Sequence, residues 1–144
     1  MLVGLGAGIQ HDASFEETKV GLAGLNLGVG GFLSEDLALM FRISGTNVNY
    51  DFGGGDEFRQ VSGVGGASLQ YWLSNRFNVE AGVGGGFWTV EDEQESGLGL
   101  ILGAAATIFN SGKHNLQIGF EYAPAFTDPG TVHNVGITLG YQFF

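Results

Sequence analysis

Apolar residues recur at every second position over most of the chain, separated by glycine or small polar residues. In the stretch 3–9, for example, Leu5, Ala7 and Ile9 alternate with glycines. Because successive residues of a β-strand point to opposite faces of a sheet, this period of two predicts strands with one apolar face and one nearly bare face. The pattern predicts strands over residues 3–9, 20–33, 37–44, 61–71, 77–87, 97–108, 115–122 and 134–143.

The second of these stretches is the least regular. We assign Leu25, Leu27, Val29 and Leu33 to its apolar face, and Asn26 and Phe32 to the other face. Counted with it, the chain has eight strands of a length suited to crossing a bilayer at a tilt, which takes about 9–11 residues.

Two kinds of connection join the predicted strands, and they alternate strictly along the chain. The short, turn-like connections are residues 34–36, 74–76 and 110–113. The longer, mostly acidic connections are residues 11–19, 53–57, 91–95 and 127–131. This alternation is typical of an up-and-down antiparallel meander with short periplasmic turns and longer outer loops.

Composition decides which face of the sheet is outside. Charged residues make up 14% of the 144 residues, against about 25% in soluble domains, and there are 27 glycines. Within the predicted strands the charges are Arg42, Glu80 and Glu121, and all three fall on the glycine-rich polar face. An interior packed with eight rows of large apolar side chains, and an outside of bare glycine, would leave no solvated exterior, whereas the reverse arrangement suits lipid.

We therefore predict an all-β fold, a closed eight-stranded antiparallel up-and-down transmembrane β-barrel that forms one domain over residues 1–144. A transmembrane helix is not expected, because the longest apolar stretch, 98–109, falls short of about 18 residues. Aromatic residues near the strand ends favour the membrane, although strands are rich in aromatics in general. These residues are Tyr71, Phe77, Phe109, Tyr141 and Phe143 near the short turns, and Tyr50, Phe52, Phe58, Phe87, Tyr122 and Phe126 near the long connections.

The end of the chain carries a family resemblance. Residues 135–144 alternate apolar side chains, contain Gly140-Tyr141, and finish on Phe143 and Phe144. This segment resembles the terminal strand of small bacterial outer-membrane barrels, the class of the OmpA transmembrane domain, OmpX, Ail-like and opacity-type proteins. The resemblance implies a location in the bacterial outer membrane, and an insertion signal at Tyr141, Phe143 and Phe144 that the outer-membrane assembly machinery reads.

The resemblance further implies a lipid bilayer as partner, and we expect a monomer. Met1 leads directly into the first predicted strand, so we expect a mature exported chain with a start methionine added. The net charge of −10, with five Lys and Arg in all, argues against a nucleic-acid partner. No motif in the sequence predicts a cofactor.

An enzyme is not expected either. Lipid A deacylases built on such barrels place a histidine and a serine one residue apart on an outward strand. His114 and His133 lack that serine, and the segment 11–14, His-Asp-Ala-Ser, lies in a predicted loop without orienting neighbours.

The three inward charges are the best-defined candidate site. Arg42 and Glu80 are predicted at similar depth, with Glu121 nearer the outer side. One reading is a polar plug that ties opposite walls together, helped by inward Trp72, Trp88 and Phe109. The alternative is a gated path for ions or water, or a narrow passage for small apolar solutes, as in OmpW-type barrels. Small barrel interiors are normally filled, which favours the plug and a structural or surface-interaction role.

A second candidate lies at the rim. If the first and last strands pair, His11 and His133 come close, with Asp12 and Asp128 in the adjoining loops. These four residues are adequate ligands for zinc or a similar divalent ion. Because ligands without supporting neighbours rarely bind tightly, the sequence favours two solvated rim histidines over a metal site.

Overall fold

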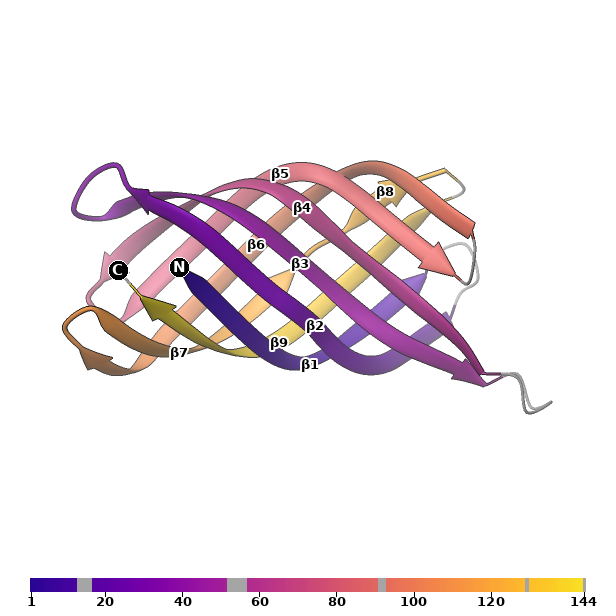
Figure 1. The fold of residues 1–144 in the computed structure, drawn as a ribbon, viewed down its shortest axis with the longest axis horizontal. Helices are drawn as coiled ribbons and strands as arrows, with labels where there is room; N and C mark the ends of the chain where they lie inside the picture. Colours follow the sequence, from indigo (N-terminus) through magenta and orange to yellow (C-terminus); the bar gives the residue numbers. More distant parts are fainter. Residues whose placement is uncertain (13–16, 52–56, 91–92, 129, 144) are drawn as a thin grey trace.

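A computed structural model describes residues 1–12, 17–51, 57–90, 93–128 and 130–143 of the chain. Nine strands make up almost all of it (Figure 1). They are β1 (Leu2–Asp12), β2 (Glu17–Phe32), β3 (Leu37–Asp51), β4 (Glu57–Ser74), β5 (Phe77–Val90), β6 (Glu93–Ser111), β7 (His114–Tyr122), β8 (Ala125–Thr127) and β9 (Thr131–Phe143). The described residues contain no helix of the length and hydropathy needed to cross a membrane.

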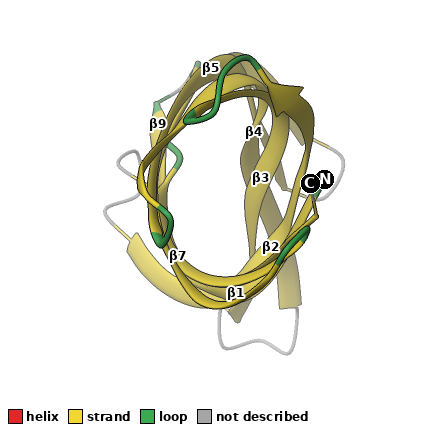
Figure 2. Ribbon diagram, turned by 90° about the vertical axis from the view of Figure 1, so that its left-hand side faces the viewer, coloured by secondary structure: helices red, strands yellow, loops and turns green. Residues whose placement is uncertain are grey.

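The strands form one closed ring. From β1 to β7 each strand pairs antiparallel with the next, β7 pairs with β9, and β9 pairs back with β1. Figure 2 shows the resulting barrel nearly end on, with the strands tilted around its wall. Because the first and last strands pair along their whole length, from Leu2 opposite Gln142 to Asp12 opposite Val132, the described sheet has no free edge.

The short strand β8 is a continuation of β7. Tyr122 on β7 faces Leu102 on β6, and Ala125 on β8 faces Gly99, so both segments keep a single register along β6. The interruption falls at Pro124, which has no N–H to give to the ladder. Counted this way the wall has eight strands, and the predicted fold class is confirmed.

The two ends of the barrel differ. Both termini and the three short turns lie at one end, on the left in Figure 1. One of these turns contains Gly112, whose φ of 62° lies in the left-handed region that favours glycine.

At the other end the strands run further than the sequence pattern predicted. β1 reaches Asp12, β2 begins at Glu17 and β6 begins at Glu93, so the parts of the predicted long connections next to the barrel are strand instead of loop. Residues 13–16, 52–56, 91–92 and 129, in or next to those connections, lie outside the described residues.

Two irregularities shift the phase of the alternation. Val20 and Leu22 on β2 are 76% and 72% exposed at even positions, whereas Leu27 and Val29 are exposed at odd positions. The register of β2 against β3 shifts between Ala23 and Leu27, and an extra residue in a strand moves the following side chains to the other face. This shift is why the stretch 20–33 fits no single alternation.

The second irregularity corrects a prediction. The register of β6 against β7 shifts between Thr107 and Phe109. Phe109, predicted to point inward, is therefore outside and 60% exposed. Phe32, also predicted inward, lies opposite the buried Ala38 of β3 and so shares the inner face, where it lines the open mouth of the barrel and is 46% exposed. Trp72 and Trp88 are buried, as predicted.

The distribution of side chains is the reverse of that in a water-soluble barrel. Large apolar residues such as Leu5, Phe41 and Leu139 cover the outside. Arginine, glutamate, asparagine, glutamine and serine side chains fill the middle of the inside. Small apolar clusters complete the interior: Val64, Ile101, Ala123 and Ala125 in one, and Leu2, Ala38 and Met40 in the other.

Candidate functional site: the polar network inside the barrel

Glycines make the room that Arg42 occupies. On β3, Arg42 faces Gly28 of β2 on one side and Gly66 of β4 on the other. The same inner row continues through Gly84 on β5 and Gly99 on β6. A Cβ atom added to Gly28 would lie 2.6 Å from Cδ of Arg42. The bare inner face predicted from the sequence is thus the space in which a long side chain crosses the barrel.

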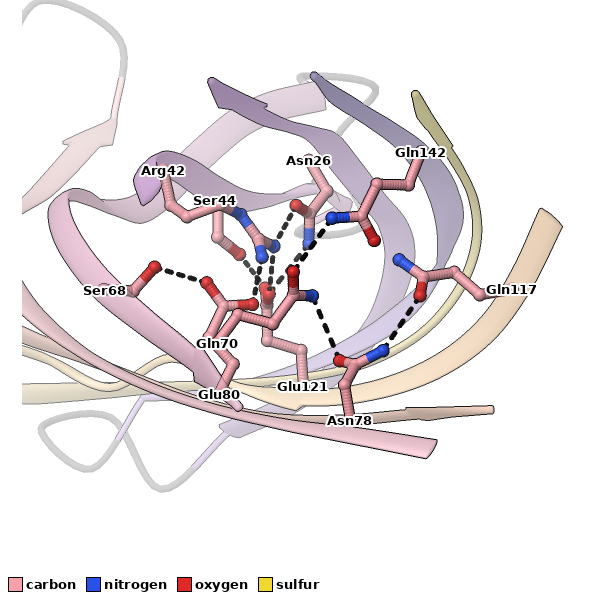
Figure 3. A network of polar contacts seen from close by, with 10 residues as sticks. All are labelled: Asn26, Arg42, Ser44, Ser68, Gln70, Asn78, Glu80, Gln117, Glu121 and Gln142. Atoms are coloured by element: carbon pink, nitrogen blue, oxygen red, sulfur yellow. Dashed lines mark hydrogen bonds and ion pairs between the residues drawn. The ribbon is translucent and has the colours of Figure 1, made fainter. Parts of the chain in front are cut away.

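Arg42 joins three strands from this position (Figure 3). Its Nη1 donates to Glu80 on β5, and its Nη2 donates to Oε2 of Glu121 on β7 at 2.8 Å. Nη2 also donates to the side-chain oxygen of Asn26 on β2. All four side chains are buried. The structure thus brings together the three charged residues that the alternation pattern had placed on the inner face.

Neutral side chains complete the hydrogen bonding of both carboxylates. Ser68 donates to Glu80, and Ser44 donates to Oε1 of Glu121. Asn26 donates through Nδ2 to Oε2 of Glu121 at 2.8 Å. The network therefore carries one positive and two negative formal charges, with hydroxyl and amide donors supplementing the single arginine.

A chain of amides lies next to the charged cluster, on the side of the termini. Gln142 donates to Gln70 at 2.9 Å, Gln70 to Asn78 at 3.0 Å, and Asn78 to Gln117 at 3.2 Å. These residues come from β9, β4, β5 and β7, so the chain spans the inside of the barrel (Figure 3). Together the two networks connect most of the strands of the wall through side chains alone.

Little space remains between these side chains. A cavity of about 30 Å³ lies among Arg42, Glu80, Gln117 and their neighbours, and one of about 10 Å³ lies beside Ser44 and Asn134. A single water needs roughly 10–15 Å³ measured in this way, so the two cavities hold at most a few waters. Larger hollows of about 240 and 320 Å³ lie at the mouth near the termini, where Phe32 lines both.

The rim residues are placed as follows. His11 and His133 face each other directly across the β1–β9 seam, with ring centroids 6.1 Å apart. The side chain of Asp12 lies outside the described residues, and Asp128 is exposed. Among the side chains that the structure describes, no three His, Asp, Glu or Cys gather into a group that could hold a metal ion. Of the four candidate rim residues, the structure therefore brings His11 and His133 together, and the Asp12 side chain is not among those it describes.

The last strand presents the aromatic residues of the predicted insertion signal. Tyr141 and Phe143 are exposed on the outside of β9, while Phe144 lies outside the described residues. The ring of His114 on β7 lies 5.2 Å from that of Phe143 and forms a hydrogen bond with the hydroxyl of Tyr141. An aromatic cluster thus marks the outer surface at the end that holds the termini.

Comparison with known proteins identifies the fold. No protein-family model matches the chain, and no curated protein sequence matches it. Solved structures do match. Neisserial surface protein A superposes with a TM-score of 0.67 at 14% identity, over 99% of this chain and 95% of that one.

Ail, the attachment invasion locus protein of Yersinia pestis, matches in three structures, one of them with a TM-score of 0.65 at 14% identity, over 99% of this chain and 97% of that one. In complex with the heparin analogue sucrose octasulfate it gives a TM-score of 0.67 at 12% identity, over 99% of this chain and 97% of that one. In a phospholipid bilayer nanodisc it gives 0.51 at 15% identity, over 99% of each chain. The chain has the fold of the small eight-stranded outer-membrane barrels.

Proposed function

We propose that this protein is a monomeric integral protein of the bacterial outer membrane, with a sealed polar interior and a structural or surface-interaction role. The observation that carries the proposal is the reversed barrel: apolar side chains outside, and a hydrogen-bonded Arg–Glu network inside. In water, the exposed apolar wall would favour aggregation. In lipid, the same wall matches its surroundings. Because the ring of described strands is closed, it exposes no unpaired strand edge to the hydrocarbon.

The two ends of the barrel differ in charge, and this bears on orientation. The short turns at the end with the termini have no net charge, because they carry two acidic and two basic residues: Glu35, Asp36, Arg76 and Lys113. The connections at the other end, within 11–19, 51–59, 91–95 and 127–131, contain many more Asp and Glu than Lys and Arg. In our proposal the short turns face the periplasm and the acidic end faces outward, as in other barrels of this kind.

The acidic end limits what the surface can bind. Ail was solved with a heparin analogue, a polyanion. An acidic surface repels polyanions, so this chain is poorly suited to that ligand. A partner of the outer end would have to be neutral or cationic, and the fold likeness therefore does not transfer Ail's ligand.

The filled interior supports a plug over a passage. Solute transport needs a continuous channel, and the cavities beside Arg42 and Glu121 amount to a few waters. The alternative function, a narrow passage for small apolar or ionic solutes, would require the network to open. We propose no catalytic role. On β9 the next outward side chain after His133 is Val135, where a deacylase would have its serine.

The closed seam and the last strand support the remaining parts of the proposal. A ring without a free edge has no strand with which to recruit a second copy, which favours a monomer. Tyr141 and Phe143, outward on β9, are the residues through which we expect the assembly machinery to recognise the chain, together with Phe144, which follows them in the sequence.

Solubility and conductance measured on the same preparation test the proposal. We expect the protein to fold only in detergent or lipid, and to give no stepwise conductance in planar bilayers. A triple variant, Arg42→Ala, Glu80→Ala and Glu121→Ala, removes the charged cluster, leaves the amide chain in place, and serves as the comparison with a widened interior. A folded monomer in plain buffer would contradict the membrane assignment. Stepwise conductance of the wild type in planar bilayers would contradict the plug and favour the passage.

A further inference from the structure

Four polar side chains form a row on the outer surface of the barrel at its acidic end. Tyr122 on β7, His133 on β9, His11 on β1 and Thr18 on β2 come from four strands that are neighbours in the ring. On β1 the next outward residue toward the middle of the barrel is Ile9, which is exposed and apolar. The row is therefore the first polar level beyond the apolar wall, at the boundary between lipid and water in the proposed orientation.

The two histidines lie at the centre of this row. They are direct partners across the seam, with ring centroids 6.1 Å apart and ring planes inclined by 22°. Two imidazoles bound to one tetrahedral ion have centroids about 5 Å apart, given metal–nitrogen distances of 2.0–2.1 Å. The observed separation exceeds this value by about 1 Å, so both rings would have to turn toward each other to bind one ion.

The outer members of the row support the histidines. Nδ1 of His11 lies 2.9 Å from Oγ1 of Thr18, and Nδ1 of His133 lies 2.7 Å from the hydroxyl of Tyr122. The Tyr122 ring stacks on His133, with centroids 6.0 Å apart and planes 7° apart. A hydroxyl that accepts from Nδ1–H fixes the tautomer in which Nε2 keeps its lone pair for a metal. The sequence alone showed no such support.

We propose that His11 and His133 bind a divalent transition-metal ion, zinc or copper, through their Nε2 atoms, with water in the remaining positions. Imidazole nitrogen suits these ions, whereas calcium and magnesium prefer oxygen. The ion would join the first and last strands of the barrel and so hold the seam closed. The inference does not depend on the role proposed for the interior.

A zinc titration followed by histidine NMR in detergent micelles tests the site directly. We expect the His11 and His133 signals to shift together, while His114, which has no second histidine beside it, stays unchanged as an internal reference. His133→Asn should abolish the shift of His11, and His11→Asn that of His133. Calcium chloride at the same concentration should produce no shift.

The supporting hydroxyls provide a second test that leaves both ligands in place. Tyr122→Phe and Thr18→Val keep the size of each side chain and remove the hydroxyl. Loss of such supporting groups typically lowers metal affinity by about 10–100-fold, and we expect an effect in that range. Zinc should also raise the urea midpoint of the wild type and of His114→Asn, but not that of His133→Asn.

Three results would overturn the proposal. They are the absence of any response at millimolar zinc, an equal response of His114, and full affinity in the Tyr122→Phe, Thr18→Val double variant. The first would leave two solvated rim histidines, and the second would indicate unspecific binding of zinc to exposed imidazoles. The third would remove the support on which the argument depends. Each result leaves the membrane assignment, which is tested by solubility, unaffected.

Discussion

Arg42 and Glu121 form an ion pair at 2.8 Å across the barrel, although their strands, β3 and β7, are not paired with each other. The contact therefore joins parts of the wall that no backbone hydrogen bond connects. Glu80 on β5 extends the link to a third strand. In a thin-walled barrel, such cross-links replace the close packing of a hydrophobic core.

The first prediction concerns Arg42→Ala. This change leaves Glu80 and Glu121 buried without their cation, and removal of one partner from a buried ion pair typically costs about 3–5 kcal/mol. We expect a loss of this order in the free energy of unfolding, measured by urea titration of the protein folded into lipid vesicles.

The control replaces the whole cluster with apolar residues, Arg42→Met, Glu80→Leu and Glu121→Leu. No charge is then stranded, so this variant should be more stable than Arg42→Ala, although the Ser44 and Ser68 hydroxyls lose their acceptors. Equal stabilities for wild type and Arg42→Ala would show that the network contributes little to folding.

The second prediction compares two outward residues at different heights. Ile137 is 60% exposed and faces Phe120, next to the level of the Arg–Glu network, while Leu73 is 63% exposed and adjoins the turn at Ser74. Arginine at the middle of a bilayer costs about 2–4 kcal/mol, and near the interface about 0–1 kcal/mol. We therefore expect Ile137→Arg to lower stability in vesicles far more than Leu73→Arg. Similar costs for both would place the membrane elsewhere on the barrel or exclude it.

The third prediction uses two adjacent glycines of β5. A Cβ atom at Gly84 would collide with the backbone of Gly65 and lie 2.5 Å from Cα of Gly66, whereas at Gly85 it would meet nothing within 4 Å. Overpacking typically costs about 1–3 kcal/mol, so Gly84→Ala should lower the urea midpoint and Gly85→Ala should not. If both variants fold equally well, the wall is more adaptable than the close β4–β5 approach implies.

Much of this fold was predictable because alternation is a strong signal wherever one face of a strand meets lipid. All eight strands, the short turns and the inward charges follow from it. The failures have local causes. The shifts near Ala23 and Phe109 add residues that reverse the phase, and Pro124 divides a strand that the pattern had ended at Tyr122.

The partners inside the barrel were only partly predictable. Asn26 was placed on the inner face, but nothing in the pattern linked it to Arg42. Ser44 and Ser68 alternate inward with Arg42 and Gln70, and short polar residues beside inward charges are the signal that could have identified them. Which strands meet across the interior depends on stagger and tilt around the ring, and alternation along one strand contains no information about these.

The last prediction tests the seam register with a covalent bond. The chain contains no cysteine, and Ile9 on β1 faces Val135 on β9 directly. Ile9→Cys with Val135→Cys should therefore form an intramolecular disulfide under mild oxidation, seen as a mobility shift on a non-reducing gel. Pairing Ile9→Cys with Val83→Cys on β5, a strand that is not paired with β1, should give none. Pairing it with Ile137→Cys tests a shift of two residues, because a slipped seam would bring that pair together instead. A bond that forms best with Ile137→Cys would move His11 away from His133, so the same gel tests the register on which the metal site depends.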